Sequence, residues 1–262
     1  MTAFDASAAA RLLHTREAGD GPLLLCLHGI GSSSASFAPQ LTAFADRYHV
    51  VAWDAPGYAA SPALPSAPGM DGYADLAAVL IASHGAPAVV LGMSWGGVIA
   101  MRLAQRHPSL VRALILGDST RGSAATPEKA AAMRARGPEL SSTGPETFSA
   151  VRAPRLLRAT APAAEVEAAA KAMAAAIRLP GYAHAADSMA ATYLEGSMGD
   201  ITAHALVLYG EHDRVTGRPE SEAIAAQIPG AALAVVPDAG HLANQENPEA
   251  FNKELSAFLS TL

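Results

Sequence analysis

The sequence predicts an α/β protein with a mostly parallel, doubly wound sheet. Short runs of leucine and β-branched residues alternate with longer helical patterns along most of the chain, and these runs are apolar almost throughout. Uninterrupted apolar strands are typical of a parallel sheet that helices cover on both faces. With 262 residues, the chain is long enough for one large domain that carries an inserted lobe.

The expected elements alternate between strand and helix. Apolar runs predict strands at residues 22–28, 49–53, 88–93, 113–117, 205–209 and 232–236. Apolar residues at helical spacing predict helices around 36–46, 71–84, 97–107, 219–228 and 248–261. Pro108 is expected to end the third of these helices, because proline lacks the N–H that a helix needs.

The alternation breaks once, from about Ser119 to about Thr202. This alanine-rich stretch contains no convincing buried strand, but its apolar residues recur at helical spacing. We therefore predict a helical cap over residues 119–202, inserted between two late strands of a core that residues 1–118 and 203–262 form. The cap is expected to lie over the C-terminal edge of the sheet, where ligands bind in open α/β sheets.

Residues 92–96 read Gly-Met-Ser-Trp-Gly and directly follow the apolar run at 88–91. A serine at the tip of a sharp strand-to-helix turn takes a strained backbone conformation, and small neighbours let the strand and the helix approach closely. A helical pattern begins immediately afterwards. The motif therefore predicts a nucleophile elbow with Ser94 as the nucleophile.

A serine nucleophile needs a base, and the base needs an acid that orients it. Asp213 follows the expected strand 205–209 in the turn Gly-Glu-His-Asp, and His241 follows the next strand in Pro-Asp-Ala-Gly-His. The order Ser94, Asp213, His241 is the one expected when each residue leaves the C-terminal end of its own strand. These residues are the predicted catalytic triad.

Other polar residues compete for the same roles. Asp118, one strand earlier, and Glu211, in the same turn as Asp213, are alternative acids. Asp54 is interpreted as a residue that fixes a loop by accepting backbone N–H groups. Four other histidines lie near element ends and are not expected to be the base. His28 is interpreted as a residue that shapes a loop, His49 and His107 border a strand and a helix end, and His212 is the neighbour of the acid.

Two backbone N–H groups are expected to form an oxyanion hole. The N–H of Trp95 follows the nucleophile at the start of a helix, where the helix dipole favours a developing negative charge. The second donor is expected from the loop His-Gly-Ile-Gly at 28–31, with Ile30 as the candidate, because the flanking glycines let the backbone turn toward a substrate. This loop is not expected to bind phosphate, since GxGxxG is absent and no lysine follows it.

These motifs together resemble the α/β-hydrolase fold family over nearly the whole chain: HGIG at 28–31, DAPGY at 54–58, GMSWGG at 92–97, GEHD at 210–213 and GH at 240–241. The tail GHLANQENPEAFN at 240–252 is similar to the corresponding segment of 3-oxoadipate enol-lactonases and related small esterases. The resemblance implies a serine hydrolase acting on a small carboxylic ester or lactone. A carbon–carbon bond hydrolase of ring-cleavage products, a cofactor-free perhydrolase and a non-catalytic ligand-binding protein are the alternatives.

Composition and charge argue against several other classes of protein. A net charge of −6 without a basic stretch argues against nucleic-acid binding. No apolar run reaches membrane-spanning length and the N-terminus lacks the pattern of a leader, so we expect a cytoplasmic protein without a membrane partner. The single cysteine, Cys26, lies in an apolar run and is expected to be a buried strand residue. No Cys/His spacing predicts a metal, and no cofactor is expected.

Overall fold

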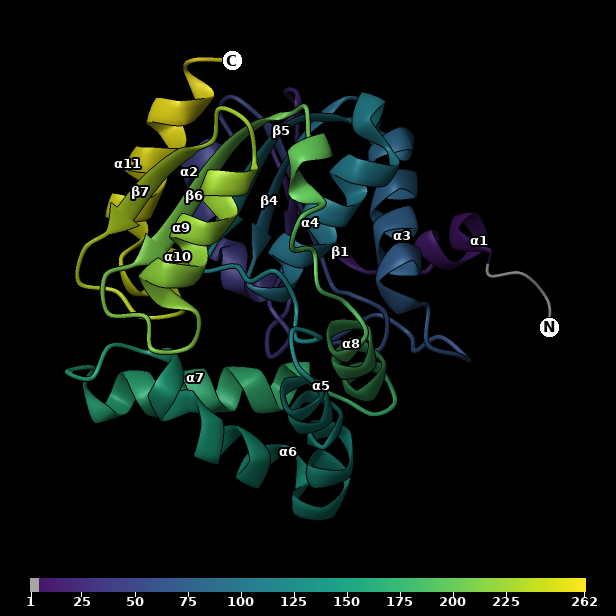
Figure 1. Ribbon diagram of the computed structural model, residues 1–262, viewed down its shortest axis with the longest axis vertical. Helices are drawn as coiled ribbons and strands as arrows, with labels where there is room; N and C mark the ends of the chain where they lie inside the picture. The colour runs from purple at the N-terminus through teal and green to yellow at the C-terminus, as the bar shows by residue number, and fades with distance from the viewer. Residues whose placement is uncertain (1–4) are drawn as a thin grey trace.

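In the computed structural model, which describes residues 5–262, seven strands form one sheet in the order β1-β3-β2-β4-β5-β6-β7 (Figure 1). The strands are β1 (Thr15–Ala18), β2 (Leu23–Leu27), β3 (His49–Trp53), β4 (Ala88–Met93), β5 (Val111–Gly117), β6 (His204–Gly210) and β7 (Ala232–Val236). β1 pairs with β3 in the antiparallel sense, and every other neighbouring pair is parallel. The predicted mostly parallel sheet is confirmed. Residues 1–4, which belong to the N-terminal segment and to the expected core, lie outside the described residues.

The helices follow the strands in the expected alternation. They are α1 (Ala6–Ala10), α2 (Ala38–Phe44), α3 (Gly69–His84), α4 (Trp95–Arg106), α5 (Pro127–Arg134), α6 (Arg136–Leu156), α7 (Ala163–Ala176), α8 (Gly181–Ala190), α9 (Gly217–Gln227), α10 (Ala243–Glu246) and α11 (Pro248–Leu259). Short 3-10 helices occupy Ser34–Phe37, Pro108–Leu110 and Met198–Asp200. Among residues 5–262, the helices are too short or too polar to cross a bilayer.

The sheet separates two hydrophobic cores. Leu23, Leu25 and Leu27 of β2 pack on the face that α3, α4 and α9 cover, whereas Leu24 and Cys26 pack on the face of α2 and α11. Successive side chains of a strand point to opposite faces, so a strand that is buried on both sides must be apolar at every position. Cys26 is fully buried, as its position in an apolar run predicted, and burial raises the pKa of its thiol.

Two N-terminal elements were not predicted. α1 is a single short helix, and β1 has the sequence Thr-Arg-Glu-Ala with both central residues exposed. β1 is an edge strand that pairs only with β3, so its side chains need no apolar pattern. The polar sequence of β1 therefore gives no hydrophobic signal of a strand.

Residues 119–202 connect β5 to β6 and form α5, α6, α7 and α8 (Figure 1). In Figure 1 these helices lie below the sheet, at the ends toward which the parallel strands point. α6 is kinked at Gly144, whose backbone is non-helical (φ 76°, ψ 161°), and side chains of its two halves meet, since Arg152 binds Glu139. We refer to α5–α8 as the cap helices.

Candidate active site

Ser94 lies at the turn between β4 and α4 in a strained conformation, with φ 50° and ψ −111°. The flanking glycines permit this turn. A Cβ atom at Gly96 would lie 2.0 Å from the carbonyl oxygen of Leu27, and one at Gly92 would lie 2.4 Å from the oxygen of Gly96. The Gly-x-Ser-x-Gly pattern therefore reflects backbone segments that touch on both sides of the serine.

The structure brings Ser94, Asp213 and His241 together from the ends of three strands. Nε2 of His241 lies 3.0 Å from Oγ of Ser94, and Nδ1 lies 3.0 Å from Oδ2 of Asp213. The Asp213 side chain is fully shielded from solvent, and that of His241 is 6% exposed. Ser94 follows β4, Asp213 follows β6 and His241 follows β7, so the parallel sheet gathers all three at one edge.

Charge and burial have opposite effects on the pKa values of His241 and Asp213. Burial disfavours the imidazolium of His241, but the hydrogen bond and the charge of Asp213 outweigh burial and raise its pKa. For Asp213, burial would raise the pKa, yet hydrogen bonds with His241 and Thr216 hold it well below its usual range. Asp213 is therefore ionised at neutral pH, and its negative charge faces Nδ1 of His241.

Thr216 contributes to this arrangement, although sequence reasoning missed it. Its hydroxyl donates to Oδ2 of Asp213 at 2.7 Å and lies 3.4 Å from Nδ1 of His241. Backbone N–H groups of Val215 and Gly217 donate to the same carboxylate at 2.7 and 2.9 Å. The available signal was the Asp-x-x-Thr spacing at the start of α9, where a carboxylate can receive the free N–H groups of a helix N-terminus.

The two expected oxyanion donors face the same cavity as Ser94. Ile30 and Trp95 both line it, and neither N–H has a hydrogen-bond partner in the described part of the chain. The 28–31 loop approaches the serine closely, since a Cβ atom at Gly29 would lie 3.4 Å from Cβ of Ser94. Two free N–H groups beside a serine hydroxyl form a suitable receptor for a developing oxyanion.

The alternative acids occupy other positions. Glu211 is half exposed and accepts from the N–H of Asp238. Asp118 is fully buried and has φ 45°, and its carboxylate accepts from the N–H groups of Gly210 (2.8 Å) and Ala243 (3.2 Å). Burial raises the pKa of Asp118 to about 8. Asp118 thus ties the end of β5 to the two loops that carry the other site residues, without a hydrogen bond to His241.

Asp54 and His28 shape the loops beside the site. Asp54 accepts from the N–H of Ser34 at 2.8 Å and from that of Ala60 at 3.3 Å, as expected of a loop-fixing carboxylate. Nδ1 of His28 lies 2.8 Å from the carbonyl oxygen of Gly29, and Nε2 accepts a hydrogen bond from the N–H of Ala55. Burial lowers the pKa of His28 to about 4, so this ring is neutral.

His49, His107 and His212 make contacts away from Ser94. His107 pairs with Asp75 at 2.7 Å, and His212 lies 3.9 Å from the exposed Glu211. His49 pairs with Glu17 on the β1 side of the sheet. These contacts are consistent with the interpretation that His241 alone among these histidines serves Ser94.

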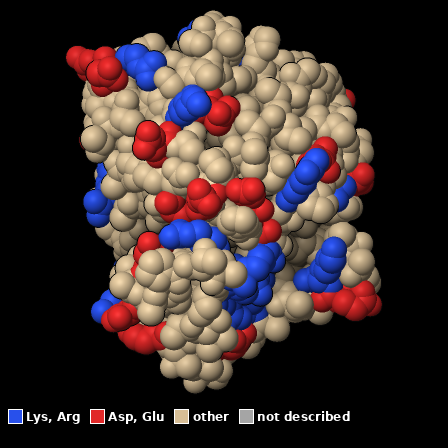
Figure 2. Space-filling model, turned by 90° about the vertical axis from the view of Figure 1, so that its left-hand side faces the viewer, with Lys and Arg blue, Asp and Glu red and all other residues tan. Residues whose placement is uncertain are grey.

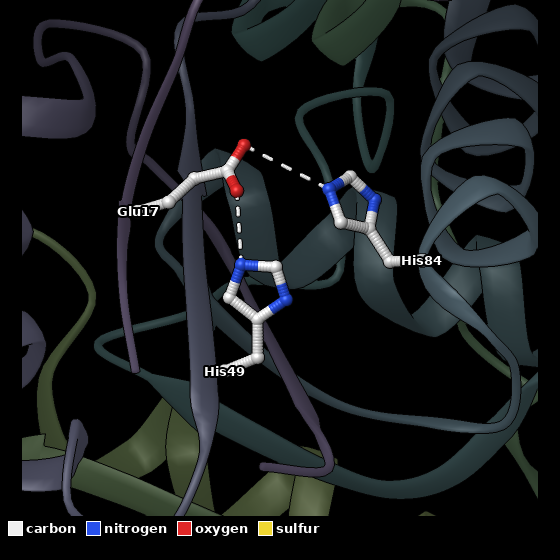
Figure 3. Close-up of side chains that lie close together, drawn as sticks. All are labelled: Glu17, His49 and His84. Atoms are coloured by element: carbon white, nitrogen blue, oxygen red, sulfur yellow. Dashed lines mark hydrogen bonds and ion pairs between the residues drawn. The ribbon is translucent and has the colours of Figure 1, made fainter. Parts of the chain in front are cut away.

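Three groups of His, Asp and Glu in the described residues have ligand atoms close enough to hold a metal: Asp118, Asp213 and His241; Glu211, His212 and Asp238; and Glu17, His49 and His84. The first group is the site itself, and the second is fully exposed. In the third, shown in Figure 3, both rings point toward the Glu17 carboxylate.

In that third group, Nε2 of His49 lies 2.9 Å from Glu17, and Nε2 of His84 lies 3.7 Å from it (Figure 3). Burial would raise the pKa of Glu17, but hydrogen bonds from Thr15 and His49 outweigh it and lower that pKa. The direct hydrogen bond between Glu17 and His49 accounts for the cluster as a partly exposed hydrogen-bonded pair.

A cavity of about 610 Å³ opens between the sheet edge and the cap helices, with Ser94 and His241 in its wall. Met133 of α5, Met173 of α7 and Met189 of α8 contribute apolar surface to it. This volume is in the range of pockets that enclose small molecules. The site can therefore hold a small substrate against the serine hydroxyl.

Comparison with known proteins agrees with this architecture. A family model described as "Alpha/beta hydrolase family" matches residues 24–254. The chain is 30% identical over 252 residues to the pimeloyl-(acyl-carrier protein) methyl ester esterase of Chromobacterium violaceum, covering 93% of this chain and 96% of that protein.

Two solved structures extend the comparison. A thermophilic esterase from Thermogutta terrifontis superimposes with a TM-score of 0.88 at 27% identity, covering 95% of this chain and 93% of that one. The enol-lactonase of Burkholderia xenovorans shares the fold with a TM-score of 0.85 at 24% identity, covering 95% of this chain and 96% of that one. The resemblance seen in the sequence motifs is confirmed.

Proposed function

The chain belongs to the alpha/beta hydrolase family, and on that premise we propose that it is a serine hydrolase that cleaves a small carboxylic ester or lactone through an acyl-enzyme. The observation that carries the proposal is the unbroken series of contacts from Ser94 to His241 to Asp213 in the wall of the cavity, each at 3.0 Å. A nucleophile, a base and an orienting acid that contact one another in this order are the groups that acyl transfer requires.

In the proposed mechanism, Oγ of Ser94 attacks the ester carbonyl carbon while Nε2 of His241 takes the hydroxyl proton. Asp213 accepts the hydrogen bond from Nδ1–H and stabilises the imidazolium. The N–H groups of Ile30 and Trp95 donate to the oxyanion of the tetrahedral intermediate. His241 then gives its proton to the leaving alcohol, and the acyl group stays on Ser94.

The second half of the reaction repeats these steps with water. Water attacks the acyl-enzyme as His241 takes its proton, and Ser94 leaves with a proton returned by His241. An esterase among the similar proteins and another among the similar structures support ester cleavage as the reaction class. The same catalytic residues could serve a carbon–carbon bond hydrolase or a perhydrolase, so the assay must include their substrates.

The test is labelling with a fluorophosphonate together with a substrate panel. We expect Ser94 to be the labelled serine, because an activated hydroxyl attacks phosphorus quickly, and Ser94→Ala to remove the label. Labelling that persists in Ser94→Ala would contradict the proposal. Turnover is measured with p-nitrophenyl acetate, p-nitrophenyl octanoate, a lactone, a ring-cleavage dienone and peracid formation. Ester or lactone hydrolysis is the expected activity, and turnover of the dienone alone would select the alternative.

A further inference from the structure

The cavity beside Ser94 is lined by an excess of positive charge. Four basic side chains line it, Lys129, Arg136, Arg152 and Arg155, against one carboxylate, Glu220. Glu220 is engaged by Arg121, which does not line the cavity and whose Nε and Nη2 both lie 3.0 Å from oxygens of Glu220; Arg121 also pairs with Glu195. The whole protein carries a net charge of −6, so a basic cavity is not a consequence of its overall composition.

The bend in α6 brings the arginines together. Arg136 lies at the start of α6, and Arg152 and Arg155 lie near its end on one face, after the chain has turned at Gly144. Arg152 is held in place by Glu139, with Nη1 2.8 Å from Oε1, and its guanidinium stacks 3.5 Å from the centre of the Phe148 ring.

Arg136 and Arg155 differ from Arg152 in that neither forms an ion pair with a carboxylate of the described residues. Burial lowers the pKa of Arg155, and the neighbouring charges of Arg136 and Arg152 lower it further. Like charges that face one cavity repel each other, and an anion placed between them would relieve this repulsion.

Arg155 also lies within electrostatic reach of the candidate base. Its charge opposes the rise in the pKa of His241 that Asp213 produces. Arg155, Ser94 and His241 line the same cavity, so an anion bound by Arg155 would share the space in which a substrate meets Ser94. Basic side chains gather at the hollow between the cap helices and the body of the molecule (Figure 2).

We propose that Arg136 and Arg155 form an anion subsite that binds a carboxylate carried by the substrate itself, so that the preferred substrates are monoesters of short dicarboxylic acids. This inference rests on the proposed function. The carboxylate of the substrate would pair with the two guanidinium groups while its ester carbonyl lies against Ser94. The cap would thus select for charge as well as for size.

The test compares two substrates of the same shape. Monomethyl glutarate carries a carboxylate, and its monoamide, methyl 5-amino-5-oxopentanoate, carries a neutral group in the same place. We expect kcat/KM for the carboxylate to exceed that for the amide by about 10-fold to 100-fold at low salt, which is the discrimination expected of a charge-assisted hydrogen bond. Salt should reduce the preference.

Arg155→Gln and Arg136→Gln should each lower this preference ratio about 10-fold and weaken competitive inhibition by free glutarate. Arg16→Gln is the matched control, because Arg16 is exposed on the edge strand β1 and the change removes the same charge. Circular dichroism and Tm check that each variant is folded. A ratio that is near 1 in the wild type, or unchanged in both cavity variants, would overturn the proposal.

Failure of the subsite and failure of the proposed function give different results. If neither ester is hydrolysed and Ser94 is not labelled, the function is wrong, and calorimetric binding of glutarate to Ser94→Ala still tests the subsite. Binding that Arg155→Gln removes from this variant would support the subsite. If glutarate does not bind to Ser94→Ala, the subsite does not exist.

Discussion

His241 is surrounded by groups that set its pKa in opposite directions. Burial and the charge of Arg155 lower the pKa, whereas Asp213 and Asp118 raise it, and the net result is a pKa above the ordinary value of imidazole. A general base must be neutral, so activity should decline as pH falls through this raised pKa. The acid limb of the pH–rate profile therefore reports on the partners of His241.

Replacing Asp213 by Asn should lower kcat about 10⁴-fold, because the amide no longer holds the imidazole in the required tautomer or stabilises its cation. The variant also loses the main influence that raises the pKa of His241, so the acid limb of kcat/KM for a neutral ester should move to lower pH. Asp118→Asn should have a far smaller effect on kcat. The reverse ranking in steady-state assays would identify Asp118 as the acid.

Asp118 should instead affect stability in a pH-dependent way. Burial raises its pKa from 3.8 in the unfolded chain to about 8 in the fold, so the folded state binds the extra proton between these values. Its contribution to stability is present at low pH and is lost as pH rises toward 8. Asp118→Asn is neutral at every pH, so the Tm of the wild type minus that of the variant should fall between pH 5 and 9. A constant difference would show that Asp118 does not titrate in this range.

Sequence reasoning could identify Ser94, Asp213 and His241 because each follows an apolar strand in a recognisable turn, and strand ends meet at one sheet edge. Their roles stay predictions. Thr216 left only the Asp-x-x-Thr spacing at the start of α9 as a signal, and Arg155 left none. Arg155 faces the cavity only because α6 turns at Gly144, and a side chain that depends on the path of a cap helix leaves no local pattern.

At the scale of elements, the elbow depends on close contact between β2 and α4. A Cβ atom at Gly96 would lie 2.0 Å from the oxygen of Leu27 and 2.9 Å from that of His28, both of them backbone atoms that no side-chain rotation can move. Gly96→Ala should therefore destabilise the fold by about 3 kcal/mol, at the upper end of overpacking costs. Gly199→Ala is the control, with its nearest atom 4.0 Å away. Equal midpoints in urea unfolding would contradict this assignment.

The predicted strands β2 to β6 are largely buried, whereas β7 is a mostly exposed edge strand that was predicted from its run of alanine, leucine and valine. β4 was predicted at its observed bounds, 88–93, because it lies in the middle of the sheet and all six of its residues are buried. β1 could not be predicted, since its four residues have only partial burial and pair along one edge. The sequence Thr-Arg-Glu-Ala of β1 contains no apolar run, so nothing in its pattern indicates a strand.

At the scale of the whole molecule, charge and apolar surface are distributed unequally between the sheet and the cap. The candidate catalytic residues and both candidate oxyanion donors come from segments outside 119–202. The basic side chains of the cavity come from α5 and α6, and its methionines come from α5, α7 and α8 together with Met93 of β4. The two parts meet closely, since a Cβ atom at Gly31 would lie 2.9 Å from Cε of Met173. We therefore expect a division of labour, in which the cap selects the substrate and the sheet edge performs the chemistry.

Substitutions in the cap should therefore change specificity without abolishing turnover. Met173→Ala and Met189→Ala enlarge the apolar wall of the cavity, and each should change the ratio of kcat/KM for p-nitrophenyl octanoate over p-nitrophenyl acetate by about 10-fold to 200-fold, the range for small volume changes in an apolar pocket. Val151→Ala is the control, because Val151 is 68% exposed on α6 and lies outside the cavity wall. Hydrolysis of p-nitrophenyl acetate should survive in every variant. If the cap variants lost all esterase activity while Ser94 still reacted with fluorophosphonate, the cap would have to supply a catalytic group, and the division of labour would be wrong.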